Sequence, residues 1–191
     1  MIIESIIQAL SQRVYDLGFV SKVGGLAREI MVSAAGVNRR VVTAAIAPFS
    51  DNRVFELSPD GKESGIAFFI AGPTRVIRQD VYTMTLENEL VLYGWLNGDL
   101  VKGDQTTDPE LLILSKIRKA NFATEEGHPV RKIEIDYVGG QEPDFARFGW
   151  DDTIFQYGAF PHRLFRHQFR CSYVVSTGCS TASVTVAGAA C

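Results

Sequence analysis

Cysteine is scarce in this sequence and is confined to its far end. The three cysteines are Cys171, Cys179 and Cys191. Their number is odd and no CxxC pair occurs, which argues against a disulfide framework and against a four-cysteine zinc site. This usage is typical of reduced thiols in a cytosolic compartment.

Long apolar runs are also missing. No stretch approaches the roughly 20 apolar residues that a bilayer-spanning helix needs. The start, MIIESIIQAL, has no basic n-region and is interrupted by Glu4 and Gln8, so we expect no signal peptide. We therefore expect no membrane partner.

The sequence lacks the common loops that bind phosphate and the common nucleophile motifs. It contains no GxxxxGK[ST], GxGxxG, GxSxG or HExxH pattern and no EF-hand loop. Gly24-Gly25 reads as a flexible joint rather than a phosphate site. We expect no cofactor.

What the sequence does contain is the composition of a globular domain. Of its 191 residues, 46% are apolar and 21% are charged. A chain of this length buries roughly 70% of its unfolded surface, which is enough for one hydrophobic core without disulfides or structural metals. The net charge of −3 argues against a protein that coats DNA or RNA, and we expect no sequence-specific nucleic-acid binding.

Two helices are indicated. Apolar residues recur at spacings of three and four from Ile3 to Leu17, and Gly18 follows at a C-cap position. Asp108-Pro109-Glu110 has the N-cap, proline and first-turn acid of a helix start, and that helix continues to about Ala120.

The remaining pattern is mainly that of β-strands. We predict two strands within 27–48, a buried strand at 64–71, long strands at 81–96 and 163–175, and one at 130–138 ended by Gly139-Gly140, with a turn at 58–61. Sixteen extended residues span about 53 Å, so the strand 81–96 either bends near Glu87-Asn88-Glu89 or projects beyond the domain. The prediction is an α+β fold: a mainly antiparallel twisted sheet with the N-terminal helix and one capped internal helix packed on it.

The last residues form a separate segment. We predict one α+β domain at 1–176 and an uncharged C-terminal arm at 177–191. Val184 and Val186 alternate as in a short strand, which would add to the sheet edge of a neighbouring chain. The alternative is a frayed terminus.

His162, His167 and Cys171 are the candidates in this sequence for a metal or nucleophile site. On a strand, His167 and Cys171 share one face with Phe165, Phe169 and Tyr173, whereas His162 lies on the other. Core packing therefore explains these residues better than metal binding does, and we predict no metal site and no catalytic residue.

Charged and aromatic residues supply candidates for contacts between subunits. Glu87 and Glu89 share a strand face beside threonines, which favours a solvated face or a subunit contact. Arg166 and Arg170 lie on the polar face of the last strand; a nucleic-acid groove is the alternative to opposite-charge pairing across a sheet or subunit boundary. The full candidate set is Glu87, Glu89, Phe148, Trp150, Phe155, Tyr157, Arg166, Arg170, Val184 and Val186.

The order of elements resembles the tail terminator and head–tail connector ring proteins of tailed bacteriophages. An amphipathic first helix, long antiparallel strands, a capped helix at Asp108-Pro109-Glu110, an irregular stretch and a long final strand carry this resemblance over roughly residues 1–176. The Ala-rich segment 27–50 and the tail 176–191 look like additions to a minimal member. The resemblance implies a non-enzymatic virion protein that forms a ring, expected to be a hexamer. Such a ring caps the tail tube and joins it to the neck connector.

Three hypotheses follow. The first is the structural ring protein of a phage virion, assembled in the host cytoplasm. The second is a non-enzymatic α+β binding or accessory module of a cell, which would use the same exposed strands to hold one partner. The third is an enzyme of unknown substrate, centred on His162, His167 and Cys171 or on Asp151 and Asp152.

Overall fold

The computed structural model describes residues 2–32, 40–46, 54–57, 62–101, 108–118, 120, 122, 130–141 and 162–176. Within them the elements are α1 (Ile2–Tyr15), β1 (Lys22–Val32), β2 (Arg40–Ile46), β3 (Val54–Glu56), β4 (Gly65–Ala71), β5 (Arg75–Gln79), β6 (Thr83–Asn97), α2 (Pro109–Arg118), β7 (Val130–Gln141) and β8 (His162–Ser176). The expected α+β class is confirmed.

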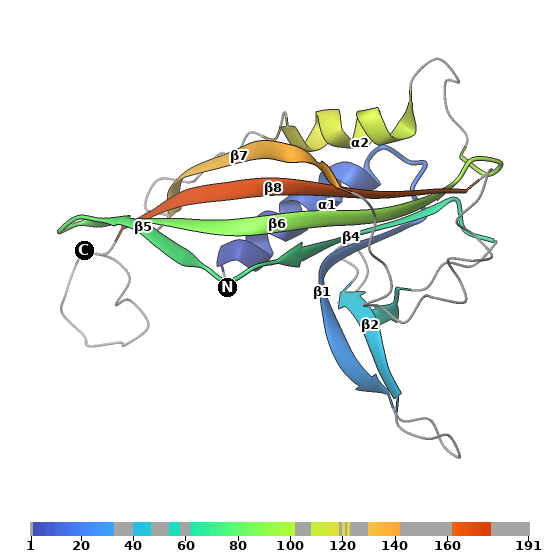
Figure 1. Cartoon of the computed structure of the whole chain (residues 1–191), viewed down its shortest axis with the longest axis horizontal. Coiled ribbons are helices and arrows are strands. Elements are labelled where there is room, and N and C mark those ends of the chain that lie inside the picture. The colour runs from blue at the N-terminus through green and yellow to red at the C-terminus, as the bar shows by residue number, and fades with distance from the viewer. Residues whose placement is uncertain are drawn as a thin grey trace.

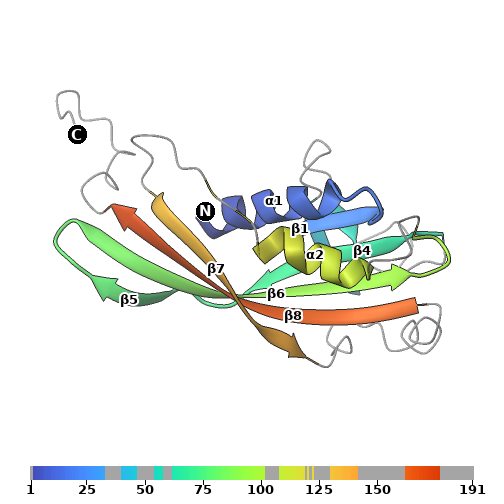
Figure 2. The same ribbon diagram turned by 90° about the horizontal axis from the view of Figure 1, so that it is seen from above.

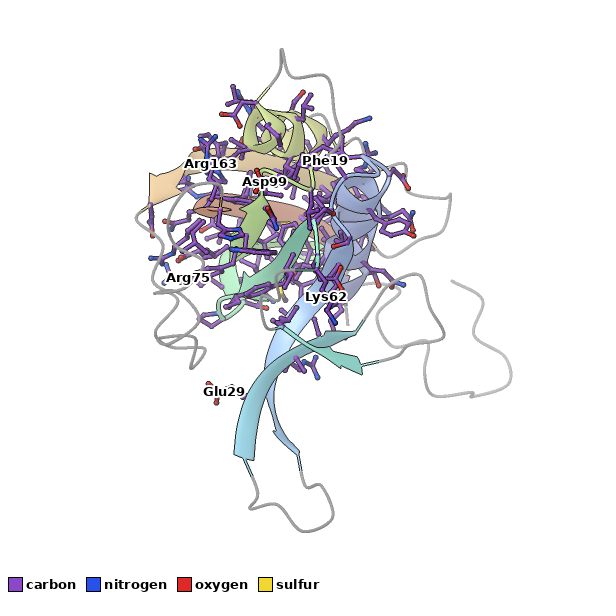
Figure 3. All side chains as sticks on the ribbon, turned by 90° about the vertical axis from the view of Figure 1, so that its right-hand side faces the viewer. Phe19, Glu29, Lys62, Arg75, Asp99 and Arg163 are labelled. Atoms are coloured by element: carbon purple, nitrogen blue, oxygen red, sulfur yellow. The ribbon has the colours of Figure 1, made fainter. Side chains whose placement is uncertain are left out.

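The described strands form one sheet in the order β3-β2-β1-β4-β6-β8-β7, and β5 pairs with β6 outside this path. Every strand pair is antiparallel except β1–β4, so the sheet is mostly antiparallel with one parallel pair. The last part of β1 and its partner β2 project from the body, with Glu29 well away from the helices (Figure 3). This projection coincides with much of the Ala-rich segment 27–50.

Both helices cover the same face of the sheet (Figure 2). The apolar stripe of α1, including Ile7 and Leu10, is buried in one core cluster with Ile113 and Ile117 of α2 and with Leu92 of β6. The amphipathic spacing that predicted α1 therefore marks its buried face. Gly18 ends the turn after α1 with φ +75°, a conformation that favours glycine, as its C-cap position predicted.

The opposite face of the sheet carries a second, smaller core. Phe68 and Tyr93 stack with their ring centroids 5.7 Å apart, and Trp95 is fully buried. Ala45 of β2 and Leu57 after β3 belong to the same cluster, so the β1–β2–β3 part of the sheet packs over this end.

The long strand predicted at 81–96 is a single strand, β6, paired with β8 along its whole length. Its other edge changes partner: β4 pairs with residues 90–96, and β5 pairs with residues 84–87. Asn88 lies at this change and is 2% exposed. Its amide donates to the carbonyl of Gly72 at 3.0 Å, and its side-chain oxygen accepts from the Tyr173 hydroxyl at 3.0 Å. The strand does not split: its first half lies between β5 and β8, and the β5–β6 turn reaches past the end of β8 (Figure 1).

Two glycine pairs lie within strands, contrary to the sequence prediction of a joint and a strand end. Gly24-Gly25 lies within β1 and is buried, and the register of β1 on β4 shifts between Val23 and Leu26. Gly139-Gly140 lies within β7, where the register on β8 shifts between Tyr137 and Gly139. Glycine in a strand often marks such a bulge, which bends the strand without ending it. The predicted turn at 58–61 lies outside the described residues.

Candidate subunit interface

The sheet face opposite the helices is charged where β5, β6, β8 and β7 lie side by side. The period-two pattern of β6 places Glu87 and Glu89 on this face, as predicted, and β8 contributes Arg170. Residues Pro73, Arg75, Glu87, Glu89, Val138, Gln168, Phe169 and Arg170 line a groove of about 120 Å³ here. We call Arg75, Glu87, Glu89 and Arg170 the charged face.

Opposite charges meet across the strands of this face. Arg170 is opposite Glu89 of β6 and Asp136 of β7, and its Nε lies 3.4 Å from Oε2 of Glu87. The Arg170 side chain is 57% exposed, so this pair contributes at most about 1 kcal/mol to stability. The predicted opposite-charge pairing across a sheet is thus confirmed for Arg170, and the carboxylates lie on a solvated face.

Arg166 behaves differently from Arg170, although both belong to the same face of β8. Its guanidinium carbon lies 5.5 Å from the centroid of the Tyr93 ring, and the side chain is half-buried. Opposite-charge pairing was the expected use of Arg166. Within the described residues its cationic group packs on the aromatic end of the second core, a cation–π contact, and its expected pairing stays a prediction.

The β5–β6 hairpin presents apolar side chains to solvent. Val76 and Ile77 are each 57% exposed, Val81 is 83% exposed and Tyr82 is 74% exposed. We call these four residues the hairpin tip. Large apolar side chains exposed close together in sequence are candidates for contact with another chain. The sequence pattern missed β5, because its five residues are exposed and do not alternate between apolar and polar.

A second apolar surface lies between α2 and β7. Leu111, Leu114, Ser115, Arg118 and Tyr137 line an open groove of about 580 Å³, which we call the helix groove. Leu111 is 59% exposed, although it belongs to an otherwise amphipathic helix. The Arg118 guanidinium carbon lies 5.9 Å from the centroid of the Tyr137 ring.

A hydrogen-bonded chain fixes α2 at this groove. The Tyr137 hydroxyl lies 3.2 Å from Nδ1 of His167, whose Nε2 lies 2.7 Å from Oε1 of Glu110. Arg163 then links Oε2 of Glu110, at 2.7 Å, to Oδ2 of Asp108, at 2.6 Å. The chain joins β7, β8 and the first turn of α2.

Asp108 is the N-cap of α2, as the sequence predicted: its Oδ1 accepts a hydrogen bond from the Glu110 N–H at 2.9 Å. Burial alone raises the pKa of the Asp108 carboxyl. The hydrogen bonds from Arg163 and from the first backbone N–H groups of α2 outweigh burial, and the pKa lies below its usual value. The hydrogen bond to Asp108 raises the pKa of Arg163.

The predicted core role of His167 and Cys171 is confirmed. Both are buried on the helix-facing side of β8, between Phe165 and Tyr173. His162 lies on the other face, where its ring stacks on Trp95 at 5.3 Å between centroids. Burial raises the pKa of the Cys171 thiol to about 12, so the thiol stays protonated at neutral pH. This disfavours Cys171 as a nucleophile.

No set of three or more His, Cys, Asp or Glu side chains within the described ranges is arranged to hold a metal ion. No helix in the described part of the chain has the length and apolar character to cross a membrane. Several predicted contact residues fall outside the described residues: Phe148, Trp150, Phe155, Tyr157, Val184 and Val186, together with Asp151 and Asp152 of the enzyme hypothesis.

Glu110, Tyr137 and the hairpin tip were not predicted as site residues. The sequence around Glu110 indicates only the start of a helix. Its contact with His167 could not be predicted, because the two residues are 57 positions apart in sequence. The segment Gln79-Asp80-Val81-Tyr82 has none of the glycine or asparagine dipeptides that signal a hairpin turn, so the sequence contains no usable signal for the hairpin tip.

Comparison of this chain with protein-family models, with curated proteins and with solved structures gives no match.

Proposed function

We propose that this chain is a structural virion protein that forms a ring, which terminates the tail tube of a tailed bacteriophage or joins it to the head–neck connector. The observation that carries the proposal is a pair of exposed apolar surfaces on different parts of one chain, the hairpin tip and the helix groove. A protein that associates through two different patches assembles head to tail, and it forms a ring when the rotation closes.

The element order supports the same proposal. The amphipathic α1, the long β6 and β8 strands and the capped α2 occur in the order expected of a tail terminator. The ring is a homo-oligomer, and the resemblance to tail terminators implies six copies. Its other partners are tail-tube and neck proteins. Its place is the virion, after assembly in the host cytoplasm, and its role is non-enzymatic.

The charged face fits a contact or lining surface of such a ring. Arg170 is paired with Glu87 across the strands, and its side chain remains largely hydrated. Charges of this kind contribute little affinity but penalise wrong registers between subunits. Glu87, Glu89, Arg166 and Arg170 accordingly remain interface candidates in this proposal.

Antibody labelling of assembled particles tests the proposal. Gold-labelled antibody against this chain is expected at the junction of head and tail, and none on the head shell or the distal tail tip. Genes for capsid, portal or tube proteins beside its gene are the second expectation. Particles without the chain and a gene with no such neighbours would instead favour a cellular binding module, which uses the same strands to hold one partner.

A further inference from the structure

We propose that the hairpin tip of one copy docks into the helix groove of the next copy. This inference rests on the proposed ring and names the contact that closes it. The hairpin tip lies at the turn between β5 and the start of β6, at one end of the sheet, and the groove is concave and partly apolar. The partner of each surface is thus supplied by a second copy of the same chain.

The chemistry of the two surfaces matches. The tip offers Val81 and Tyr82, which are among the most exposed large apolar side chains of the described residues. The groove offers Leu111 and Leu114 from α2 and the ring of Tyr137 from β7. Burying apolar side chains against each other is favourable by about 25 cal/mol per Å² removed from water. An aromatic anchor such as Tyr82 entering a groove is the usual centre of a protein interface.

The charges match as well. Arg118 is the charged residue of the helix groove, and within the described residues it contacts the Tyr137 ring but makes no ion pair. Asp80 stands beside the hairpin tip, with its side chain 52% exposed, and it is paired with Arg78 at 3.2 Å. Because the Asp80 carboxylate stays half exposed in its pair with Arg78, the guanidinium of Arg118 would share it at the rim of the groove, where exposed pairs set register.

The hairpin tip and the helix groove lie on different parts of one chain. The hairpin reaches one end of the long axis, whereas α2 lies toward the other end in both views (Figures 1 and 2). The network from Tyr137 through His167 to Glu110 fixes α2 on the sheet, and β6 is paired with β8 along its length. A tip that meets a different surface on the next copy gives a contact that repeats around a ring.

Cysteine crosslinking between two variants tests this contact. One chain carries Tyr82→Cys and the other Leu111→Cys, both with Cys179→Ser and Cys191→Ser, so that buried Cys171 is the remaining native thiol. With a short bismaleimide, we expect covalent dimers from the mixture of the two chains and none from either chain alone. Tyr15→Cys, an exposed site on α1 outside both surfaces, replaces Leu111→Cys as the matched control and should give no dimer.

The outcomes separate this inference from the proposed ring. A ring-sized mass without a crosslink in the mixture overturns the docking contact and leaves the ring standing. Dimers from Tyr82→Cys alone overturn it in favour of two tips meeting across a twofold axis. A monomeric mass with no crosslink contradicts both proposals.

Charge reversal gives a second, independent test. Arg118→Glu is expected to raise the concentration at which half of the ring dissociates by about tenfold, the size of a moderate interface residue. Combining it with Asp80→Lys should recover much of that loss, because the pair is then reversed. Glu134→Lys on the β7 surface serves as the control for a charge change alone. If Glu134→Lys weakens the ring as much as Arg118→Glu does, the proposed contact is contradicted.

Discussion

The imidazole of His167 and the carboxylate of Glu110 lie 2.7 Å apart, although 57 residues separate them in sequence. His167 is 5% exposed, and Glu110 belongs to the first turn of α2. This contact joins the strand at the centre of the helix-facing core to the helix that borders the proposed groove. The position of α2, and hence the shape of the groove, depends on it.

We predict that His167→Phe lowers the free energy of unfolding by about 1–3 kcal/mol, the cost of leaving buried hydrogen-bonding groups without partners. The new ring retains the packing against Phe165 but bonds neither Glu110 nor Tyr137. Urea unfolding measures the change. Glu134→Gln, which removes an exposed ion pair with Lys132, should stay within about 0.5 kcal/mol. A His167→Phe protein as stable as that control would show that the network does not hold α2.

The Asp108 carboxyl predicts an acid-dependent part of the stability. Its pKa in the folded chain is below the usual 3.8, so the ionised form stabilises the fold above that pH. This contribution is lost as the pH falls below 3.8 and through the folded pKa. Because the pair with Arg163 is partly exposed, the effect should stay under about 1 kcal/mol.

Asp108→Asn isolates this contribution, since asparagine also caps helices. Wild type should exceed Asp108→Asn in unfolding free energy at pH 6, and this difference should shrink as the pH is lowered from 6 to 2. A constant difference between pH 6 and pH 2 would contradict the ion pair as its source.

Gly94 and Phe165 form a second close relationship. They are directly opposite each other on β6 and β8, and a Cβ on Gly94 would lie 1.9 Å from Cζ of the Phe165 ring. Gly94→Ala therefore forces the buried ring to move, and we predict a loss of about 1–3 kcal/mol, as for an overpacked core.

The double variant Gly94→Ala with Phe165→Leu tests the cause, because the smaller side chain makes room for the new methyl group. The two losses should not add: the double variant should be more stable than their sum predicts by at least about 0.5 kcal/mol. If the two losses simply add, the clash with the Phe165 ring is not the cause of the loss in Gly94→Ala.

The arm at 177–191 remains a prediction of the sequence, because it lies outside the described residues. Deleting it should leave the melting temperature of the isolated domain nearly unchanged and should weaken assembly. Two valines bury too little surface to offset an ordering cost of about 1–2 kcal/mol per residue. A drop of many degrees in the isolated domain would show instead that the arm packs on its own core.

Periodicity predicted the parts of this fold that a local pattern determines. The apolar spacing of α1, the capping signal at Asp108 and the alternation that puts Glu87 and Glu89 on one face all describe single elements, and the structure confirms them. Gly139-Gly140 was misread because a glycine pair at a bulge has the same local signature as one in a turn.

The pairing of Glu110 with His167 could not be predicted, since it depends on how β8 and α2 meet in space. The hairpin tip was missed for a related reason. β5 is a strand because it pairs with β6. Its own sequence does not alternate between apolar and polar residues, so it lacks the pattern that predicts a strand.

The mass of the protein in solution and in the assembled particle tests the central claim most directly. Native mass spectrometry of the purified chain, with particles analysed in parallel, is expected to give a closed oligomer, about six times the 21.1 kDa of one chain. A strict monomer that joins no larger assembly would contradict the account.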